Sequence, residues 1–188
     1  MKERIITEAR QLFNHLGVTT VRLDDIAQQL GISKKTLYQY FESKEDLVRQ
    51  MLESQLNESL DEASAIHGHV TNPIEGALLI WDQLIYYKQT VNPNFLRDIE
   101  RHYATVWALF QAFRTHYINT ILVANLRAGV DQGLYRSDLD ETIVAWWWLE
   151  QSQYDVPFEG AESAIKHQFV RGLLTQRGLA LYEGMRTN

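Results

Sequence analysis

The sequence predicts an all-α fold. Apolar residues recur three and four positions apart along most of the chain, which is the spacing of one face of a helix. No run alternates apolar and polar residues in the way that a half-buried strand does. The 188 residues include only 10 glycines and 3 prolines, so few positions favour turns.

The first 66 residues show four helical segments, each followed by a turn or loop signal. Gly17 and Gly31 end the first two segments, because glycine commonly follows the last residue of a helix. Ser33 can cap the third segment, since its hydroxyl can accept a hydrogen bond from an amide of the first turn. Ser43 and Asp46 resemble a capping box at the start of the fourth segment. The predicted helices cover residues 2–16, 23–30, 34–41 and 44–66.

Five further helices are predicted in the rest of the chain. Pro73 suits the first position of a helix, where its missing N–H would have no partner in any case. Either Asp138 or Asp140 can start the fourth of these five helices. Loops are expected at residues 67–72, 92–94, 133–136 and 154–160. The predicted helices cover residues 73–91, 95–102, 104–132, 138–153 (or 140–153) and 161–183.

The composition excludes several classes of protein. The chain has no cysteine, which rules out disulfide scaffolds, thiolate zinc sites and cysteine nucleophiles and is typical of a reducing compartment. The best candidate for a membrane span, residues 102–126, is interrupted by Arg114. The N-terminal segment MKERIITEAR carries charges where a signal peptide needs an apolar core. We therefore expect a cytoplasmic protein without a membrane partner.

Charge is distributed unevenly along the chain. The net charge is −6, but residues 1–50 carry eight Lys and Arg against seven Asp and Glu, a net charge of +1. Residues 51–188 carry ten basic against seventeen acidic side chains, a net charge of −7. A weakly basic first part joined to an acidic second part indicates two functions in one chain.

Residues 23–40, LDDIAQQLGISKKTLYQY, contain the sharpest motif. Ala27 supplies the small residue that a helix-turn-helix needs where its two helices cross, and Gly31 permits the turn. The shared apolar seam consists of Ile26, Leu30 and Leu37, and Ile32 fills the core from the loop. The outward face of the third helix is left to lysines, hydroxyls and an amide, which suits entry into a DNA major groove.

This motif resembles the DNA-binding domain of the tetracycline-repressor (TetR) family. The resemblance is carried by Ile26-Ala27, Leu30-Gly31-Ile32-Ser33-Lys34-Lys35-Thr36-Leu37-Tyr38, Tyr40-Phe41 and Ser43-Lys44-Glu45-Asp46-Leu47. It implies a helix-turn-helix domain over residues 1–47 and a helical regulatory, ligand-binding and dimerisation domain over residues 48–188. It further implies a homodimeric repressor that a small-molecule ligand releases from a palindromic operator.

The resemblance also assigns DNA contacts residue by residue. Positions 33, 34, 36, 38 and 40 match residues that contact phosphates or base edges in related repressors, and Lys44 matches a phosphate-contacting lysine. Lys35 departs from the family pattern, in which glycine is frequent, and can bond guanine acceptors. Arg22 departs as well, and we expect it to reach a phosphate. The predicted DNA-binding residues are Arg22, Ser33, Lys34, Lys35, Thr36, Tyr38, Gln39, Tyr40 and Lys44.

The second part of the chain is rich in aromatic residues, which supply both apolar surface and polar anchors to ligand pockets. The predicted ligand-binding residues are Trp81, Phe95, Trp107, Phe110, Tyr117 and Trp147. The resemblance implies that the last two helices form a four-helix interface with those of a second copy. Trp146, Trp147 and Trp148 span about 200° of a helix surface, so we expect at least one to face that copy or the cavity.

The chain lacks the nucleophile-elbow, P-loop and dinucleotide-binding motifs of common enzymes. His67 and His69 have no carboxylates nearby in the sequence, so we expect no metal site, no cofactor and no catalysis. The expected partners are double-stranded operator DNA, a second copy and an unidentified small-molecule effector. Two alternatives stay open: a helical dimer that binds a small molecule or protein without a role in transcription, and a DNA-binding regulator that needs no ligand or activates.

Overall fold

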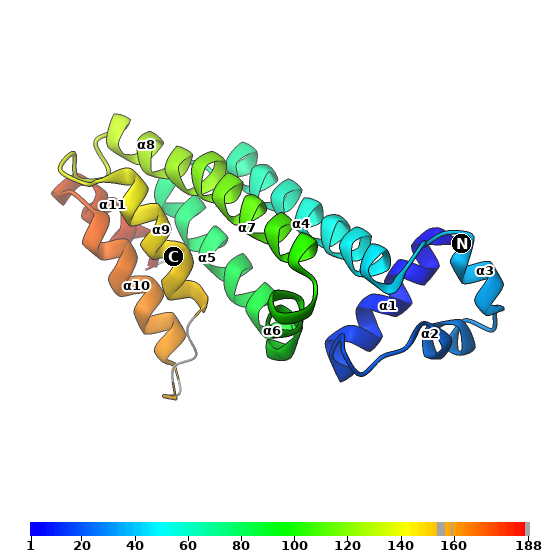
Figure 1. Ribbon diagram of the computed structural model, residues 1–188. Helices are drawn as coiled ribbons and strands as arrows, with labels where there is room; N and C mark the ends of the chain where they lie inside the picture. Colours follow the sequence, from blue (N-terminus) through cyan, green and yellow to red (C-terminus); the bar gives the residue numbers. More distant parts are fainter. Residues whose placement is uncertain (154–156, 159, 187–188) are drawn as a thin grey trace. The chain divides into compact units, whose positions relative to one another are not determined.

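The computed structural model describes residues 1–153, 157–158 and 160–186 (Figure 1). These residues form helices and no β-strand, which confirms the predicted all-α fold. No helix among them combines the length and the apolar composition that a membrane span needs. The helices are α1 (Lys2–Leu16), α2 (Leu23–Gln29), α3 (Lys34–Tyr38), α4 (Lys44–His69), α5 (Pro73–Thr90), α6 (Pro93–His102), α7 (Ala104–Tyr117), the π-helix η1 (Ile118–Leu122), α8 (Val123–Asp131), α9 (Glu141–Gln153), α10 (Ala161–Leu173) and α11 (Gln176–Arg186).

α4 ends later than the sequence predicts. It continues through residues 67–69, which were expected in a loop, so that part of the prediction is wrong. The break before α5 is short because Asn72 caps α5 directly. Its Oδ1 accepts hydrogen bonds from the amides of Ile74 and Glu75, each at 3.0 Å.

The last predicted helix, over residues 161–183, is two helices in the structure. Leu174 interrupts it with an extended backbone, at a ψ of 142°. Two backbone hydrogen bonds hold this break against the turn after α8. The Arg136 N–H donates to the Leu173 carbonyl and the Thr175 N–H to the Leu134 carbonyl, both at 2.9 Å. The partners lie far apart in the sequence, so helical periodicity could not reveal the interruption.

The long helix predicted over residues 104–132 is a continuous helical run that contains a π-helical turn, η1, between α7 and α8. Asp140 starts α9, since its Oδ1 accepts from the amides of Thr142 and Ile143 at 3.1 and 3.0 Å. The loop predicted over residues 154–160 falls mostly outside the described residues.

Packing divides the chain into two compact units. The head unit consists of Met1–Ser59 and Gln89–Arg114, and the body unit of Leu60–Lys88 and Thr115–Asn188. The head unit therefore includes α6 and the first part of α7 in addition to the N-terminal helices. The domain boundary expected after residue 47 concerns the division of functions and stays a prediction.

One apolar core holds the head unit together. Phe13 of α1, Leu37 of α3 and Leu47 of α4 are buried in it. Phe95 and Ile99 of α6 belong to the same core, so α6 and the first four helices share one interior. Full burial of a side chain of this size contributes about 1.5–3 kcal/mol, which makes α6 an integral part of the head unit.

The body unit contains an aromatic core and a buried polar cluster, in which Asn125, Tyr135 and the Pro73 carbonyl are hydrogen-bonded. Trp81, Trp148 and Phe169 contact one another, with ring centroids 5.0–6.3 Å apart. Tyr135 is buried in the turn that follows α8, and its ring lies against Gly129. A Cβ at Gly129 would lie 2.0 Å from that ring, so only glycine fits there without movement.

Candidate nucleic-acid interface

α2 and α3 form a helix-turn-helix within the head unit. Ile26 and Leu37 are fully buried in the core that the two helices share. Gly31 adopts a φ of +65°, which side chains disfavour, and the chain then reverses. The Ile32 N–H donates to the Ala27 carbonyl at 3.0 Å and closes the turn. One face of α3 therefore points into the core, and the opposite face is left outside.

α3 has only five residues and depends on its cap. Ser33 Oγ accepts a hydrogen bond from the Thr36 N–H at 3.0 Å, as the sequence predicts, and lies 2.8 Å from Thr36 Oγ1. A serine cap contributes about 1 kcal/mol to helix stability. The Ser33 hydroxyl thus fixes the first turn of α3, and its hydrogen bond to the Thr36 hydroxyl orients both side chains.

α3 and the two residues that follow it carry exposed side chains of the predicted set. Tyr38 is 46% and Tyr40 is 40% exposed, large fractions for aromatic residues beside a well-filled core. Lys35 and Gln39 are exposed as well. A tyrosine offers a partner both a ring face and a hydroxyl, so this side of α3 presents charge, amide and phenol together.

Lys34 is held by an ion pair that sequence reasoning missed. Its Nζ lies 2.9 Å from Oδ1 and 3.0 Å from Oδ2 of Asp24, and both side chains are 56% exposed. The hydrogen bond and the charge of Asp24 raise the pKa of Lys34. Asp24 lies on α2, ten positions earlier, and only the crossing of α2 and α3 brings the two together. Because the pair is exposed, a phosphate can replace Asp24.

Lys44 is the first residue of α4, where the helix dipole favours an anion. It is half-buried, and its Nζ lies 6.0 Å from the centre of the Phe13 ring. Burial lowers the pKa of Lys44, while the charges of Asp98 and Asp25 oppose that shift. The ammonium therefore sits at a helix start with nearby carboxylates that favour its charged form.

The capping box predicted for α4 is only half formed. Ser43 Oγ accepts from the Asp46 N–H at 3.1 Å, as expected. Asp46 Oδ2, however, accepts from the Glu42 amide at 3.2 Å rather than from the amide of Ser43. The start of α4 is fixed by both bonds.

Arg22 stands at the entry to α2 with an exposed side chain. Its backbone N–H donates to Asp25 Oδ2 at 2.7 Å, which fixes the first turn of α2. All nine predicted DNA-binding residues therefore lie in the head unit, on or beside α2, α3 and the start of α4.

The six predicted ligand-binding residues are divided between the two units. In the head unit, Phe95 is buried, and Trp107 and Phe110 pack against the same core with their ring centroids 5.5 Å apart. In the body unit lie Trp81, Tyr117 and Trp147. The structure therefore does not place the six in one unit, since three lie in each.

Within the body unit, Trp81 and Trp147 both contact Phe169, at centroid distances of 5.0 and 5.2 Å. Tyr117 is buried, and its hydroxyl donates to Gln83 Oε1 at 3.3 Å. Sequence reasoning did not select Phe169, which contacts two of the selected residues, or Gln83, which accepts the hydrogen bond of Tyr117.

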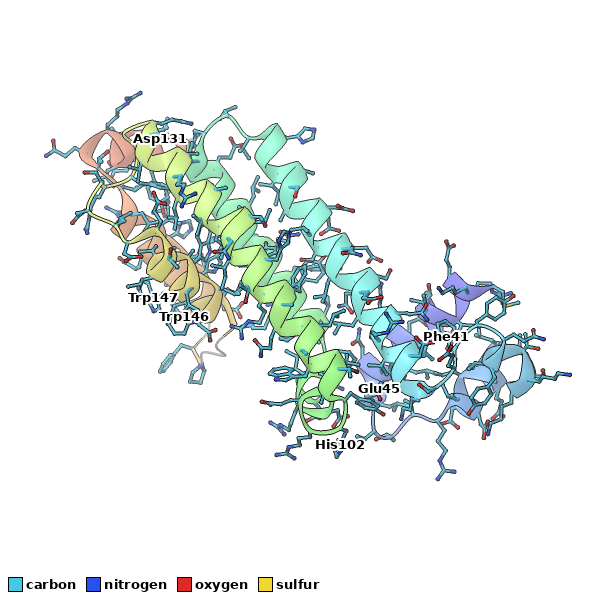
Figure 2. All side chains as sticks on the ribbon, turned by 45° about the horizontal axis from the view of Figure 1, so that its top comes forward. Phe41, Glu45, His102, Asp131, Trp146 and Trp147 are labelled. Atoms are coloured by element: carbon cyan, nitrogen blue, oxygen red, sulfur yellow. The ribbon has the colours of Figure 1, made fainter. Side chains whose placement is uncertain are left out.

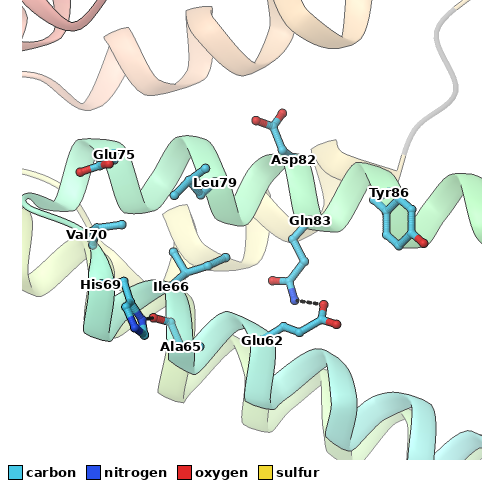
Figure 3. Close-up of a pocket in the computed structure, with 10 residues that line it drawn as sticks. All are labelled: Glu62, Ala65, Ile66, His69, Val70, Glu75, Leu79, Asp82, Gln83 and Tyr86. Atoms are coloured by element: carbon cyan, nitrogen blue, oxygen red, sulfur yellow. Dashed lines mark hydrogen bonds between the residues drawn. The ribbon is translucent and has the colours of Figure 1, made fainter.

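An open groove of about 670 Å³ runs between the end of α4 and α5 in the body unit (Figure 3). Gln83 and Glu62 meet in it, with the Gln83 Nε2 donating to Glu62 Oε2 at 3.3 Å. None of the six predicted ligand-binding residues lines this groove. The described residues include no group of three or more His, Asp or Glu that could hold a metal ion. His69 Nδ1 lies 2.7 Å from the Ala65 carbonyl oxygen, and the side chain of His67 is outside the described part.

A comparison with known proteins matches the segment that contains the helix-turn-helix. Residues 5–51 match the family model of bacterial regulatory proteins, tetR family. An uncharacterized HTH-type transcriptional regulator of Bacillus subtilis, YvaF, is 26% identical over 173 residues, which cover 92% of this chain and 88% of that protein. The biofilm operon icaADBC negative transcriptional regulator IcaR of Staphylococcus epidermidis is 36% identical over 61 residues, 32% of this chain and 33% of IcaR. A TetR/AcrR-family regulator from Thermobifida fusca has a TM-score of 0.67 at 25% identity, covering 93% of this chain and 97% of that chain.

These matches agree with the geometry of the head unit. The matched segment begins in α1 and ends in α4, so it contains the helix-turn-helix and the exposed side of α3. The relatives are transcriptional regulators and not enzymes, as the sequence predicts for this chain. The chain is therefore similar over residues 5–51 to bacterial regulatory proteins of the tetR family, and over most of its length to HTH-type and TetR/AcrR-family transcriptional regulators.

Proposed function

We propose that the protein is a homodimeric repressor that binds a palindromic operator and leaves it when a small molecule binds. The exposed residues Lys35 and Tyr38 of α3, with the adjoining Gln39 and Tyr40, carry this proposal, because they present base-reading groups on and just after a short helix. The relative IcaR is a negative regulator, which supports repression rather than activation.

The nine DNA-binding residues divide by chemistry into two roles. Arg22, Lys34 and Lys44 act as phosphate contacts, because charge recognises the backbone without reading sequence. Lys35 and Gln39 read base edges, since a lysine pairs with guanine acceptors and a side-chain amide pairs with adenine. The hydroxyls of Ser33, Thr36, Tyr38 and Tyr40 complete the phosphate and base contacts.

A second copy is needed because one head makes few phosphate contacts and would bind weakly at physiological salt. Two heads of a symmetric dimer read two half-sites about one helical turn of DNA, or a multiple of it, apart. This requirement makes the operator palindromic, since the symmetry of the dimer is repeated in its site.

We place the dimer interface on α9 and α10. On α9, Ile143 is 64% exposed and Trp146, which is labelled in Figure 2, is 54% exposed. Their spacing of three positions puts them on one face of the helix. Tryptophan is enriched at protein interfaces, and exposed apolar faces of this kind mark interaction sites.

We place the effector site in the body unit, at Trp81, Tyr117 and Trp147. Tyr117 immediately precedes the π-helix η1, and such turns occur frequently at functional sites. Among the described residues, the buried Nε1 atoms of Trp81 and Trp148 have no hydrogen-bond partner. A buried indole N–H usually finds an acceptor, which an effector with oxygen atoms can supply. Phe95, Trp107 and Phe110 of the head unit form the second candidate group.

The proposed release is a shift of population. An effector that binds more tightly to dimers whose two heads are wrongly spaced lowers the fraction able to bind DNA. α4 is the lever that we expect to transmit this change, because it runs from Lys44 at the DNA side into residues of the body unit.

The proposal is tested by selection of bound sequences from a random duplex pool with the purified full-length protein. Enrichment of one palindrome supports a sequence-specific dimeric regulator and supplies the operator for an effector screen. Absence of enrichment at low salt refutes the repressor and leaves a helical ligand-binding protein without a role in transcription.

The interface is tested by light scattering on Trp146→Glu and, as a matched control, Tyr86→Glu. Both residues are exposed aromatics of the body unit, but Tyr86 lies on α5. We expect Trp146→Glu to give monomers and Tyr86→Glu to keep the dimer. A dimer that survives Trp146→Glu while Tyr86→Glu dissociates it would move the interface to α5.

A further inference from the structure

A carboxylate of α6 holds the turn between α1 and α2. Asp98 Oδ2 accepts two hydrogen bonds from Thr19, one from its backbone N–H at 3.0 Å and one from its hydroxyl at 3.1 Å. Hydrogen bonds to an ionised acceptor are roughly twice as strong as neutral ones. The two residues are 79 positions apart, so this contact depends entirely on the packing of the head unit.

The turn is shaped to receive this carboxylate. Val18 and Val21 are buried in the head core, whereas Thr19 between them is exposed. Gly17 has a φ of +84°, and a Cβ there would lie 3.4 Å from Asp98 Oδ2. The carboxylate therefore lies directly over the backbone that leads into α2, and the turn has one fixed position relative to α6.

The same side of the head unit also holds the start of α4. The Thr105 hydroxyl of α7 donates to Glu45, which follows Lys44 in α4. Asp98 is the first of the two carboxylates whose charge opposes the effect of burial on Lys44. α6 and α7 thus contact both segments from which the predicted phosphate contacts Arg22 and Lys44 extend.

We propose that Asp98 is a positioning residue for DNA binding, which holds the α1–α2 turn that leads to Arg22 and does not touch DNA. The inference rests on the proposed DNA contact of Arg22. It predicts an effect opposite in sign to simple electrostatics. Removing an acidic charge near a DNA-binding surface strengthens binding, whereas loss of a positioning residue weakens it.

The test compares Asp98→Ala with Glu100→Ala in the full-length protein. Glu100 is exposed on the same helix, so its substitution removes an equal charge two positions away. Binding is measured over a range of salt concentrations to the palindrome that the wild type selects and to an unrelated duplex. We expect Asp98→Ala to bind the palindrome about tenfold more weakly, a change of about 1.4 kcal/mol. Its salt slope should stay unchanged, because no phosphate contact is removed.

Glu100→Ala should leave the affinity unchanged or slightly tighter. An affinity of Asp98→Ala that is equal to or tighter than that of the wild type overturns the proposal. Should Asp98→Ala fail to fold, Thr19→Val decides, since it keeps the shape and the N–H but lacks the hydroxyl. Thr19→Val should weaken binding, whereas Thr19→Ser should bind as the wild type does. Equal binding by the wild type, Thr19→Val and Thr19→Ser overturns the proposal.

A second readout separates this inference from the repressor proposal. Hydrogen exchange of the amides in residues 17–22 should be faster in Asp98→Ala than in the wild type, because the Thr19 N–H loses its acceptor. Unchanged exchange overturns the positioning role, whatever the DNA result. If the wild type selects no palindrome, the repressor proposal alone is refuted. The affinities of the wild type and of Asp98→Ala for the unrelated duplex then still test the positioning role of Asp98.

Discussion

Gly129→Ala tests the packing of the body unit, and its cost can be worked from the structure. The new Cβ would lie 2.0, 2.3 and 2.5 Å from three atoms of the Tyr135 ring, far inside contact distance. The ring cannot turn away freely, because the Tyr135 hydroxyl shares its one proton between the Pro73 carbonyl at 2.9 Å and Asn125 Oδ1 at 3.2 Å. Tyr135 is also 1% exposed, so no open space adjoins it.

The expected loss of unfolding free energy combines three terms. Forcing a methyl group into a packed core costs about 1–3 kcal/mol. Each hydrogen bond of Tyr135 that breaks as the ring moves costs about 1 kcal/mol. Alanine returns about 1 kcal/mol because it favours a helix more than glycine does. We therefore expect Gly129→Ala to unfold with about 2 kcal/mol less free energy than the wild type.

The measurement is urea unfolding followed by circular dichroism at one fixed protein concentration, since a dimer's stability depends on concentration. Gly68→Ala is the control, because Gly68 is helical and a Cβ there meets no atom within 4 Å. It should be as stable as the wild type or more so. Tyr135→Leu combined with Gly129→Ala should cost less than the sum of the two changes, because the clash is shared. A Gly129→Ala protein as stable as the wild type would refute this account of the turn.

The remaining predictions concern DNA binding and pH. Lys44→Ala should reduce the salt slope of operator binding by about one unit, the loss of one phosphate contact, whereas Lys35→Gly should change the selected sequence more than the affinity. Asp24→Asn should tighten binding at low salt, because it frees Lys34 and removes an acidic charge, and the gain should shrink as salt rises. His167 Nδ1 lies 2.6 Å from the hydroxyl oxygen of Tyr182, and burial lowers the pKa of this histidine below its usual 6.5. The unfolded chain therefore binds a proton that the folded chain does not, so stability should fall as the pH drops through 6.5, and His167→Gln should remove that part of the fall.

Each of these predictions has an outcome that contradicts it. An unchanged salt slope in Lys44→Ala would remove Lys44 from the phosphate contacts, and an unchanged selected sequence in Lys35→Gly would end its base-reading role. Weaker binding by Asp24→Asn would mean that the ion pair orders Lys34 for DNA. A wild type and a His167→Gln variant with the same dependence of stability on pH would exclude the histidine as a cause.

The sequence by itself determined the all-α fold, the approximate position of most helices and the helix-turn-helix. Ser33 caps α3 and Gly31 permits the turn as predicted, because a cap and a left-handed residue act on amides within a few positions. The apolar seam of Ile26 and Leu37 also follows from spacing, since one helical face must be buried. Local rules therefore sufficed for the exposed side of α3.

Only the tertiary structure decided how distant segments meet. It pairs Asp24 with Lys34 across two helices, interrupts the last predicted helix at Leu174, and lays Asp98 over the turn that contains Thr19. It also places Phe95 in the head unit rather than beside the body aromatics. Such contacts depend on helix crossings and on which side chains share a core. Helical periodicity specifies the face that is buried and carries no information about the segment that covers it.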